Sequence, residues 1–508
     1  MSHAHARPTR RHALAGVLAG GTFFAVGWLV GILTDPPAAP HRALGATVVD
    51  LSPTWLKDFA IETFGTADKL VLFLAIAVVA TALAAGIGVL AGRRPVAGML
   101  AVLVLGGVCA VAALGRPDTA DLAVLPALAG SLVGALSLAV LTRPLATASD
   151  DGRRRFLGTA LGVSATAAVA ATAGAVLGRT RASVEGARES VTLPEPSQVP
   201  DAAESDLAGA QVELEGMPEY VTDNADFYRI DTALSVPQID PAEWELRIHG
   251  LVDQEVRLTF DELTDAALTE AMVTLTCVSN PIGGDLVGNA TWLGLPIRDL
   301  LARAGVQEGA DMVLSTSADG WTAGTPLEAL TDDRHALLAI GMNGQPLPTE
   351  HGFPVRMVVP GLYGYVSATK WVTEMKVTTF AEDVAYWTPR GWSERGPIRT
   401  ASRIDVPRSG ASVPAGQVRL GGTAWAQQRG ITRVQVQIDD GPWEDAELAA
   451  GVSIDTWRQW SFTWTGATSG RHAVRCRAWD DEEVQTAETA APAPSGATGY
   501  HVISLEVD

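Results

Sequence analysis

Long apolar runs alternate with short charged segments over the first 180 residues of the chain. Five of these runs are long enough to cross a bilayer as helices, which takes about 20 residues. They lie near residues 13–33, 70–91, 96–115, 122–142 and 156–178. The pattern predicts an all-α transmembrane bundle of about five helices over residues 1–180.

Basic residues gather at alternate ends of these runs. Arg10–Arg11 precede the first run, Arg93–Arg94 join the second to the third, and Arg153–Arg155 precede the fifth. Because basic loops stay on the cytoplasmic side, residues 34–69 and everything after 180 are expected outside the cytoplasmic membrane. The sequence therefore predicts a multi-pass protein with an extracytoplasmic soluble part.

The segment "DDGRRRFLGTALG" (150–162) has two interpretations. Arg153-Arg154 with Phe156 and Leu157 is similar to a twin-arginine export signal, which addresses folded proteins for export. It also fits a plain basic flank of the fifth run. The runs hold no histidine and no charge near their centres, so we expect an anchor without a membrane haem or a proton relay.

The periodicity changes after the last apolar run. Residues 181–215 are rich in Ala, Glu, Ser and Pro without a repeat, which is typical of a linker. "WELRIHGLV" (244–252) alternates as a strand, "TFDELTDA" (259–266) begins a Thr-capped helix, and Gly305 would end the helix "IRDLLARAG". Interleaved strands and helices predict an α+β domain over residues 216–404.

Residues 405–508 show a third pattern. Short alternating runs such as "VRLGGTAWA", "RQWSFTWTG" and "YHVISLEV" are separated by Gly and Asp turns. This is typical of an Ig-like β-sandwich of about 100 residues. The predicted fold class is thus multi-domain: a helical transmembrane bundle, an α+β domain and a C-terminal β-sandwich.

Charge and cysteine content narrow the function. The net charge of -20 argues against a nucleic-acid partner, because phosphate binding needs clustered cations. Of the three cysteines, Cys109 lies in an apolar run and Cys476 alternates with apolar residues as a core position would. Cys277, in "TLTCVSNPIGG" (274–284), stands where a strand ends and a turn begins.

Three interpretations of Cys277 stay open on its local sequence. It is a buried structural thiol, a nucleophile that needs a histidine base, or a soft ligand for a thiolate-preferring metal. Zinc is disfavoured, since no CxxC or HExxH spacing accompanies it.

A second candidate group lies in "HGFPVRMVVPGLYGYVSATKW" (351–371). It holds His351, Arg356 and Lys370 around several glycines. Arg and Lys near glycines suit phosphate binding, because Gly permits close backbone approach and Arg offers a bidentate fork. The alternative is three unrelated surface cations.

Four segments together resemble the molybdenum-cofactor domain of the sulfite oxidase family. They are "DFYRIDTALSVP" (226–237), "TLTCVSN" (274–280), "MNGQPLPTEHGFPVRMVVPGLYG" (342–364) and "TKW" (369–371). The β region after them resembles the Ig-like dimerisation domain of that family. The resemblance covers residues 216–508 and leaves out the apolar half.

The resemblance implies a molybdenum–molybdopterin cofactor whose metal is bound by the Cys277 thiolate. It also implies that Arg229 contacts the substrate as a catalytic residue. The implied cofactor-binding residues, besides Cys277, are Phe227, Tyr228, Arg229, Asp231, Ser317, His351, Arg356, Ala368, Thr369 and Lys370.

The chain departs from the family pattern at the expected substrate pocket. Asn280 is followed by Pro281 and Ile282 where sulfite oxidases carry two arginines. Trp392 stands in place of the active-site tyrosine, and Asp231 in place of a histidine. Fewer cations suit a larger or less charged substrate.

We therefore expect a membrane-anchored molybdopterin oxidoreductase that catalyses oxygen-atom transfer on a small or sulfur-containing substrate. A methionine-sulfoxide-type S- or N-oxide reductase of the same superfamily is the alternative, and a cofactor-free binding module is the alternative of another class. No haem segment is evident, so an external cytochrome or quinone is expected to carry electrons. The C-terminal domain would form a homodimer.

Overall fold

A computed structural model describes residues 6–53, 56, 68–116, 119, 122–143, 150–181, 184–199, 204–233 and 235–508. The chain divides into two units. The first holds residues 1–183 with 233–235, and the second holds residues 184–232 with 236–508.

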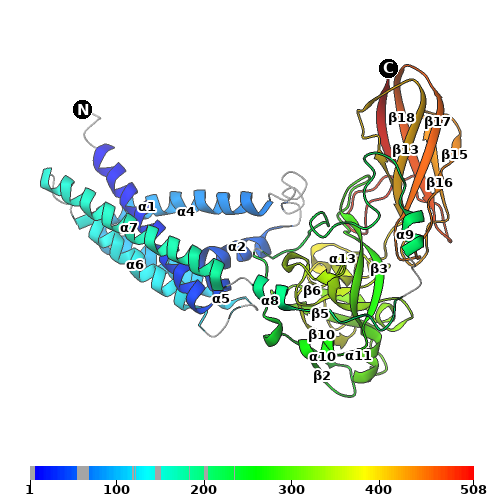
Figure 1. Cartoon of the computed structure of the whole chain (residues 1–508). Coiled ribbons are helices and arrows are strands. Elements are labelled where there is room, and N and C mark those ends of the chain that lie inside the picture. The colour runs from blue at the N-terminus through cyan, green and yellow to red at the C-terminus, as the bar shows by residue number, and fades with distance from the viewer. Residues whose placement is uncertain are drawn as a thin grey trace. The chain divides into compact units, whose positions relative to one another are not determined.

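The regular elements of the N-terminal unit are all helices in its described residues (Figure 1). Five of its helices are long and apolar enough to cross a membrane, as the sequence predicts. They are α1 (Ala6–Thr34), α4 (Asp68–Arg93), α5 (Pro95–Leu114), α6 (Leu125–Thr142) and α7 (Asp150–Arg181). Between α1 and α4, the expected outer loop also contains η1 (Pro36–Ala38) and α2 (Pro40–Leu51). Residues 54–55 and 57–67 of that loop lie outside the described part of the chain.

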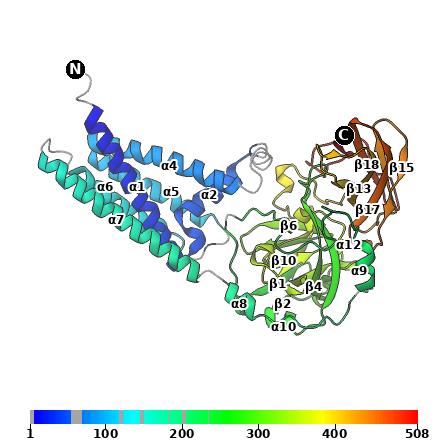
Figure 2. The ribbon, with the colours of Figure 1, turned by 45° about the horizontal axis from the view of Figure 1, so that its top comes forward.

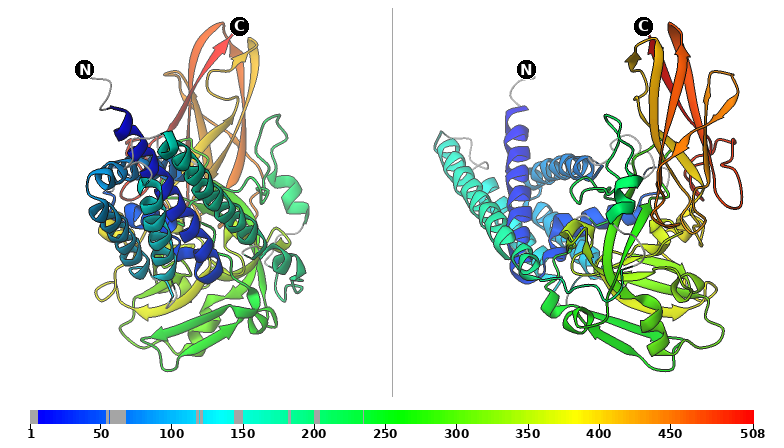
Figure 3. Two further views of the ribbon diagram at one scale, coloured as in Figure 1. Left: turned by 90° about the vertical axis from the view of Figure 1, so that its left-hand side faces the viewer. Right: turned by 45° about the vertical axis from the view of Figure 1, so that its right-hand side comes forward.

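Helix α1 packs against α4, α6 and α7 (Figure 3). Small residues permit the close approach. A Cβ added to Gly16 would lie 2.0 Å from the carbonyl oxygen of Ala84, and one added to Gly130 would lie 2.5 Å from that of Phe23. Close backbone approach at small residues is how helices associate within a membrane. None of the described residues in the most apolar stretch of α4 is buried. The apolar side chains of this stretch are therefore at least partly exposed on the surface of the helical unit.

The first part of the second unit is built on one mixed sheet and one antiparallel sheet (Figure 2). One has the strand order β2-β1-β10-β5-β6, and the other has the order β3-β4-β7-β8 with β9 paired to β7. Their bounds are β1 (Glu245–Gly250), β2 (Val256–Thr259), β3 (Thr269–Thr276), β4 (Val287–Pro296), β5 (Met312–Ser317), β6 (Thr322–Pro326), β7 (Leu337–Met342), β8 (Gln345–Pro346), β9 (Arg356–Val358) and β10 (Val372–Thr378).

Among the described residues, seven short helices accompany these strands, and two of them confirm the sequence prediction. Helix α10 (Phe260–Thr264) begins with a capping box between Thr259 and Glu262. Helix α11 (Ile297–Ala304) ends at Gly305, which has a φ of 70°. The others are η4 (Pro241–Glu243), α12 (Glu328–Thr331), η5 (Thr349–His351), α13 (Gly364–Ser367) and η6 (Thr388–Arg390).

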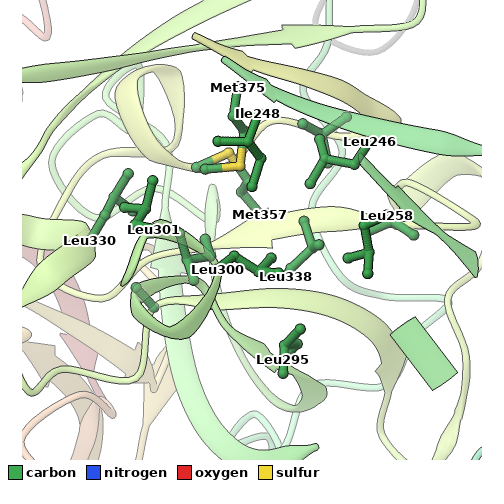
Figure 4. Packing of buried hydrophobic residues seen from close by; sticks show 14 of the residues in the cluster. Leu246, Ile248, Leu258, Leu295, Leu300, Leu301, Leu330, Leu338, Met357 and Met375 are labelled. Carbon is green, nitrogen blue, oxygen red and sulfur yellow. The ribbon is translucent and has the colours of Figure 1, made fainter. Parts of the chain in front are cut away.

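One apolar core joins the two sheets (Figure 4). Ile248 and Met375 are cross-strand neighbours in the parallel pair β1–β10. They belong to the same buried cluster as Leu338 of β7 and Met357 of β9. Leu300 and Leu301 of α11 complete this side of the core. The core therefore fixes β9 and the start of β10, which flank the candidate site.

The C-terminal part consists of two further sheets packed face to face, which confirms the predicted strand-rich region. Their orders are β11-β13-β17-β16 and β12-β19-β18-β14-β15, and one buried cluster draws residues from both. The predicted core position Cys476 lies in it. The strands are β11 (Ala401–Val406), β12 (Ser412–Val413), β13 (Gly416–Trp425), β14 (Arg433–Ile438), β15 (Trp443–Asp445), β16 (Glu447–Leu448), β17 (Arg458–Ala467), β18 (Gly470–Trp479) and β19 (His501–Val507).

The segment 181–215 is not a free spacer where it is described. It contains α8 (Glu185–Ser190) and α9 (Glu204–Ala210). Arg188 donates hydrogen bonds to the carbonyl oxygens of Pro346 and Leu347, at 3.1 and 2.9 Å. The backbone N–H of Val212 bonds Gln459 at 2.7 Å. The described part of this segment therefore packs along the second unit, although its polar composition predicts a linker. The composition does not indicate the packing, because scattered single residues make the contacts.

Candidate functional site

Cys277 follows directly after β3, at the start of a tight turn that returns to β4. Its backbone N–H bonds the carbonyl oxygen of Leu286 at 2.9 Å, and its carbonyl accepts from the N–H of Asn280 at 3.1 Å. The Asn280 side chain accepts from the N–H of Leu286 at 3.0 Å. The residue is 9% exposed, and burial raises the pKa of its thiol. The turn thus holds one thiol in a fixed, dry position.

Residues of the C-terminal sandwich contact this turn. Arg403 donates to the carbonyl oxygen of Gly284 at 2.7 Å and forms an ion pair with Asp405 at 2.7 Å. Gly283 has a φ of +72°, and a Cβ added there would lie 2.3 Å from the ring of His501. Only glycine meets both conditions.

The strand that leads to Cys277 is held from the same side. Gln427 donates to the carbonyl oxygen of Thr274 at 2.8 Å. The Thr274 hydroxyl accepts from the N–H of Trp457 at 2.7 Å, and its own N–H bonds the carbonyl oxygen of Asp455 at 2.9 Å. Residues of the sandwich therefore hydrogen-bond the backbone groups of Thr274 on β3. Together with the contacts at Gly283 and Gly284, they position the thiol from both ends of the turn.

His351, Arg356 and Lys370 converge as the second motif predicts. Arg356 and Lys370 form an isolated β-bridge, and Arg356 donates to the carbonyl oxygen of His351 at 3.0 Å. Lys370 donates to the carbonyl oxygen of Glu350 at 3.0 Å. All three side chains belong to buried residues, which excludes the alternative of unrelated surface cations.

Burial disfavours the protonated, charged form of each of these three side chains and so lowers its pKa. It lowers the pKa of Lys370 to about 8, that of Arg356 to about 10 and that of His351 to about 4. Asp231 offsets part of the charge, since its carboxylate lies 2.6 Å from Lys370 and 2.9 Å from Arg229. Three cations thus face the carboxylates of Asp231 and, more remotely, Glu350. The surplus positive charge suits a bound dianion.

Two aromatic residues link the thiol to this cluster. Phe227 packs edge-on against Trp292 and against His351, with ring centroids 5.7 and 5.6 Å apart. Tyr228 stacks on Phe227 at 5.2 Å. Burial raises the pKa of Tyr228, the charge of Cys277 adds to the rise, and Arg356 opposes it. The pKa of Tyr228 therefore depends on both Cys277 and Arg356.

The remaining expected cofactor contacts lie on β5 and before β10. The hydroxyl of Ser317 is buried, and among the described residues it has no hydrogen-bond partner. Thr369 shares a 2.7 Å hydrogen bond with Ser315, and the N–H of Ala368 bonds the carbonyl oxygen of Gly364 at 2.9 Å. A buried hydroxyl without a partner is costly, so Ser317 points to a group that binds there.

Some contributors to the site carry no signal in the local sequence. Trp292 lies under the Arg356 guanidinium, 4.9 Å from ring centroid to carbon. The carbonyl oxygen of Asn224 lies 3.1 Å from His351 Nε2. Arg229, expected beside the substrate, makes its described ion pair with Asp231. Among the described residues, no three His, Cys, Asp or Glu side chains are grouped to hold a metal ion, so a metal on Cys277 would need other donors.

Comparisons with known proteins find a matching family model and similar chains. Residues 233–387 match the family model described as oxidoreductase molybdopterin binding domain. Mitochondrial sulfite oxidase of Mus musculus is 31% identical over 323 residues, covering 54% of this chain and 58% of that protein. The uncharacterized oxidoreductase YuiH of Bacillus subtilis is 34% identical over 157 residues, covering 31% of this chain and 76% of that protein. The crystal structure of the sulfane dehydrogenase SoxCD of Paracoccus pantotrophus has 24% identity and a TM-score of 0.48, covering 57% of this chain and 81% of its own.

The chain belongs to the sulfite oxidase family of molybdopterin-dependent oxidoreductases. It spans 58% of the length of the mouse relative. The family implies the molybdenum cofactor, and the described residues fit it in three respects: a single buried thiol, a buried cluster with surplus positive charge, and the unpartnered hydroxyl of Ser317. An enzyme is thus shown, and the alternative of a cofactor-free binding module loses its support.

Proposed function

We propose that the protein is a membrane-anchored molybdenum-cofactor enzyme that catalyses oxygen-atom transfer, with sulfite as the first substrate to test. The observation that carries the proposal is the placement of the Cys277 thiol. It is buried in a turn held by hydrogen bonds at both ends. Tyr228, whose pKa is raised by burial and by the charge of this thiol, stacks on Phe227, which packs against His351 of the cationic cluster. A soft, immobile thiol beside an anion site is what a metal held by sulfur and a phosphate-bearing organic ligand requires.

The chain's own residues divide into two groups. Cys277 would bind the metal, which when bound supplies two-electron redox chemistry and oxygen exchange. Arg356 and Lys370 would bind the phosphate of the organic ligand, and His351 would be a neutral hydrogen-bonding group at the same end, since its pKa is lowered to about 4. The proposed pterin contacts are Phe227, Tyr228, Asp231, Ser317, Ala368 and Thr369.

Arg229 is the proposed catalytic residue for orienting an oxyanion. Its side chain is 38% exposed and paired with Asp231, so binding a substrate anion would require it to share or leave that carboxylate. The turn after Cys277 offers Pro281 and Ile282 instead of cations. This favours the reduction of an S- or N-oxide as the second candidate function, because such substrates carry less charge at the reacting atom.

We further propose that the five apolar helices anchor the enzyme in the cytoplasmic membrane, with the second unit outside. The alternation of basic segments supports this topology. An external cytochrome or quinone would exchange electrons with the enzyme, and the C-terminal sandwich would be an Ig-like homodimerisation domain. Resistance to alkaline carbonate extraction, and reporter fusions after residues 50 and 200, test the anchor and its orientation.

The decisive experiment measures molybdenum and pterin in the purified full chain, wild type beside Cys277→Ser. Cys476→Ser is the matched control, because Cys476 is also buried but lies in the sandwich core. We expect near-stoichiometric metal in the wild type and the control. In Cys277→Ser we expect loss or alteration of the sulfur-to-metal absorption band. Folded wild type without metal and pterin would refute the proposed function.

Direction is then tested by turnover. Sulfite oxidation is followed with an artificial acceptor, and sulfoxide reduction with reduced viologen. Activity in one assay and not in the other decides between the two candidate functions.

A further inference from the structure

A pocket of about 390 Å³ lies where the end of the catalytic domain meets the last loop of the sandwich. Its lining includes Ser393, Glu394, Arg395, Arg399 and Ser495. None of these residues belongs to the thiol turn or to the cationic cluster. The two serine hydroxyls hydrogen-bond to each other at 2.5 Å, which joins the two walls.

The pocket is rich in cationic donors. Arg399 is held through its Nε by the carbonyl oxygen of Ser495 at 3.4 Å, an arrangement that keeps the guanidinium at the pocket. Arg395 stacks over the Phe380 ring, with its guanidinium carbon 4.8 Å from the centroid, and pairs with Glu328 at 3.2 Å. Both members of that pair are more than half exposed, so the pair is weak and Arg395 can exchange it for a ligand. The one carboxylate in the lining is that of Glu394.

Tyr363 contacts residues that line this pocket. Tyr363 accepts a hydrogen bond on its hydroxyl from the N–H of Arg399 at 3.2 Å, and its own N–H bonds the carbonyl oxygen of Gly396 at 2.8 Å. A Cβ added to Gly496, next to Ser495, would lie 2.3 Å from that hydroxyl.

On its other side Tyr363 belongs to the buried cluster that contains Val278, the neighbour of Cys277. A Cβ added to Gly364, the residue after Tyr363, would lie 3.9 Å from the carbonyl oxygen of Thr276, the residue before Cys277. Tyr363 therefore contacts residues of the pocket and also belongs to the buried cluster next to Cys277.

We propose that this pocket binds the anionic group of an organic substrate, with Arg399 as the main contact and Arg395 as the second. The inference rests on the second candidate function, the reduction of an S- or N-oxide, and names its substrate class. Because none of the pocket residues belongs to the thiol turn, an anion held by Arg399 is not the reacting atom. The substrate is therefore a sulfur or nitrogen compound that carries a carboxylate or sulfonate at a distance from that atom. Binding energy from such a remote group can position the reacting atom.

The test uses two substrates with the same reacting sulfur, 3-(methylsulfinyl)propanoate and its methyl ester. Reduction of either to the thioether consumes two electrons, from two reduced viologens, and two protons, and it releases water. In the wild type we expect a lower KM for the acid than for the ester. Arg399→Gln should raise the KM for the acid by about tenfold to a hundredfold, the value of a charge-assisted hydrogen bond, and should leave the ester unchanged.

Arg419→Gln is the matched control, because Arg419 is an exposed arginine on β13. Equal KM values for acid and ester, or an equal effect of Arg399→Gln on both, would overturn the inference.

A binding measurement keeps the inference separate from the proposed function. Calorimetry with 3-(methylsulfonyl)propanoate, a sulfone analogue, reports anion binding without turnover. We expect the wild type and Arg419→Gln to bind the analogue, and we expect Arg399→Gln to bind it at least about tenfold more weakly. Molybdenum-loaded enzyme that does not bind the analogue would refute the pocket and leave the proposed function intact. If folded wild type contained no molybdenum and no pterin but bound the analogue, the binding would support the pocket and the missing cofactor would refute the proposed function.

Discussion

Gly283→Ala tests whether the sandwich holds the thiol turn in place. Gly283 has a φ of +72°, and the new Cβ would lie 2.3 Å from both Cδ2 and Nε2 of His501. A side chain in left-handed conformation costs about 1–2 kcal/mol, and overpacking against a buried ring costs about 1–3 kcal/mol. The substitution should therefore lower the free energy of unfolding of the second unit by about 2–5 kcal/mol.

Gly309→Ala separates the steric part from the conformational part. Gly309 has a φ of +93°, and no described atom lies within 4 Å of where its Cβ would be. It should cost only the conformational part, about 1–2 kcal/mol. In a domain of this size each kcal/mol lowers Tm by about 2 °C. We expect a fall of about 4–10 °C for Gly283→Ala and of about 2–4 °C for the control.

The assay follows thermal unfolding of the detergent-solubilised holoenzyme together with its molybdenum content. Because Gly283 lies in the turn that begins at Cys277, we expect metal occupancy to fall in Gly283→Ala and to stay at the wild-type level in Gly309→Ala. His501→Ala combined with Gly283→Ala removes the clash, and the pair should be less destabilising than the sum of its members. Equal Tm shifts and equal metal content for the two glycine variants would refute the reasoning.

Three further predictions follow from contacts elsewhere. Burial beside Arg403 lowers the pKa of His501 to about 4, so the unfolded chain binds more protons between pH 6.5 and 4. The contribution of His501 to the free energy of unfolding is therefore complete above pH 6.5, and up to about 1.4 kcal/mol of it is lost for each unit by which the pH falls. In His501→Gln, Tm should depend less on pH across this range. Asp231→Asn leaves the Lys370 ammonium without its carboxylate partner, 2.6 Å away, and should destabilise the cofactor-free chain by about 3 kcal/mol. Added inorganic phosphate should restore part of the lost Tm, and an unchanged Tm would contradict the ion-pair argument. In the helical unit, Gly16→Ala places a Cβ 2.0 Å from a carbonyl oxygen of α4, whereas no described atom lies within 4 Å of a Cβ at Gly86. Only Gly16→Ala should lower the Tm of that unit in detergent.

The local part of the fold is predictable from the sequence. The five apolar runs, the capped helix α10, the Gly305 terminus and the alternating strands of the sandwich each depend on residues close together in the chain. The thiol at the end of β3 is also a local feature. His351, Arg356 and Lys370 lie within 20 residues of one another, and an isolated β-bridge between Arg356 and Lys370 brings two of them together.

The long-range part of the site is not predictable in this way. Arg403 and His501 reach the thiol turn from positions more than 100 residues later in the chain. No periodicity marks them, since each side chain is placed by the register of its own strand. The segment 181–215 is missed for a related reason: its contacts come from isolated residues such as Arg188, which a polar composition conceals.

These long-range contacts also bear on what the sandwich does. If it served only to join two chains, its contacts with the catalytic domain would not need to converge on one turn. Instead Arg403 satisfies the carbonyl oxygen of Gly284, and Gln427 satisfies that of Thr274, on either side of Cys277. Truncation of Arg403 or Gln427 would remove one of these hydrogen bonds while the sheets stay in place, at a cost of about 1–3 kcal/mol each, and would free the turn to move. The position of the thiol therefore depends on the C-terminal sheets within a single chain, whether or not a second copy is bound.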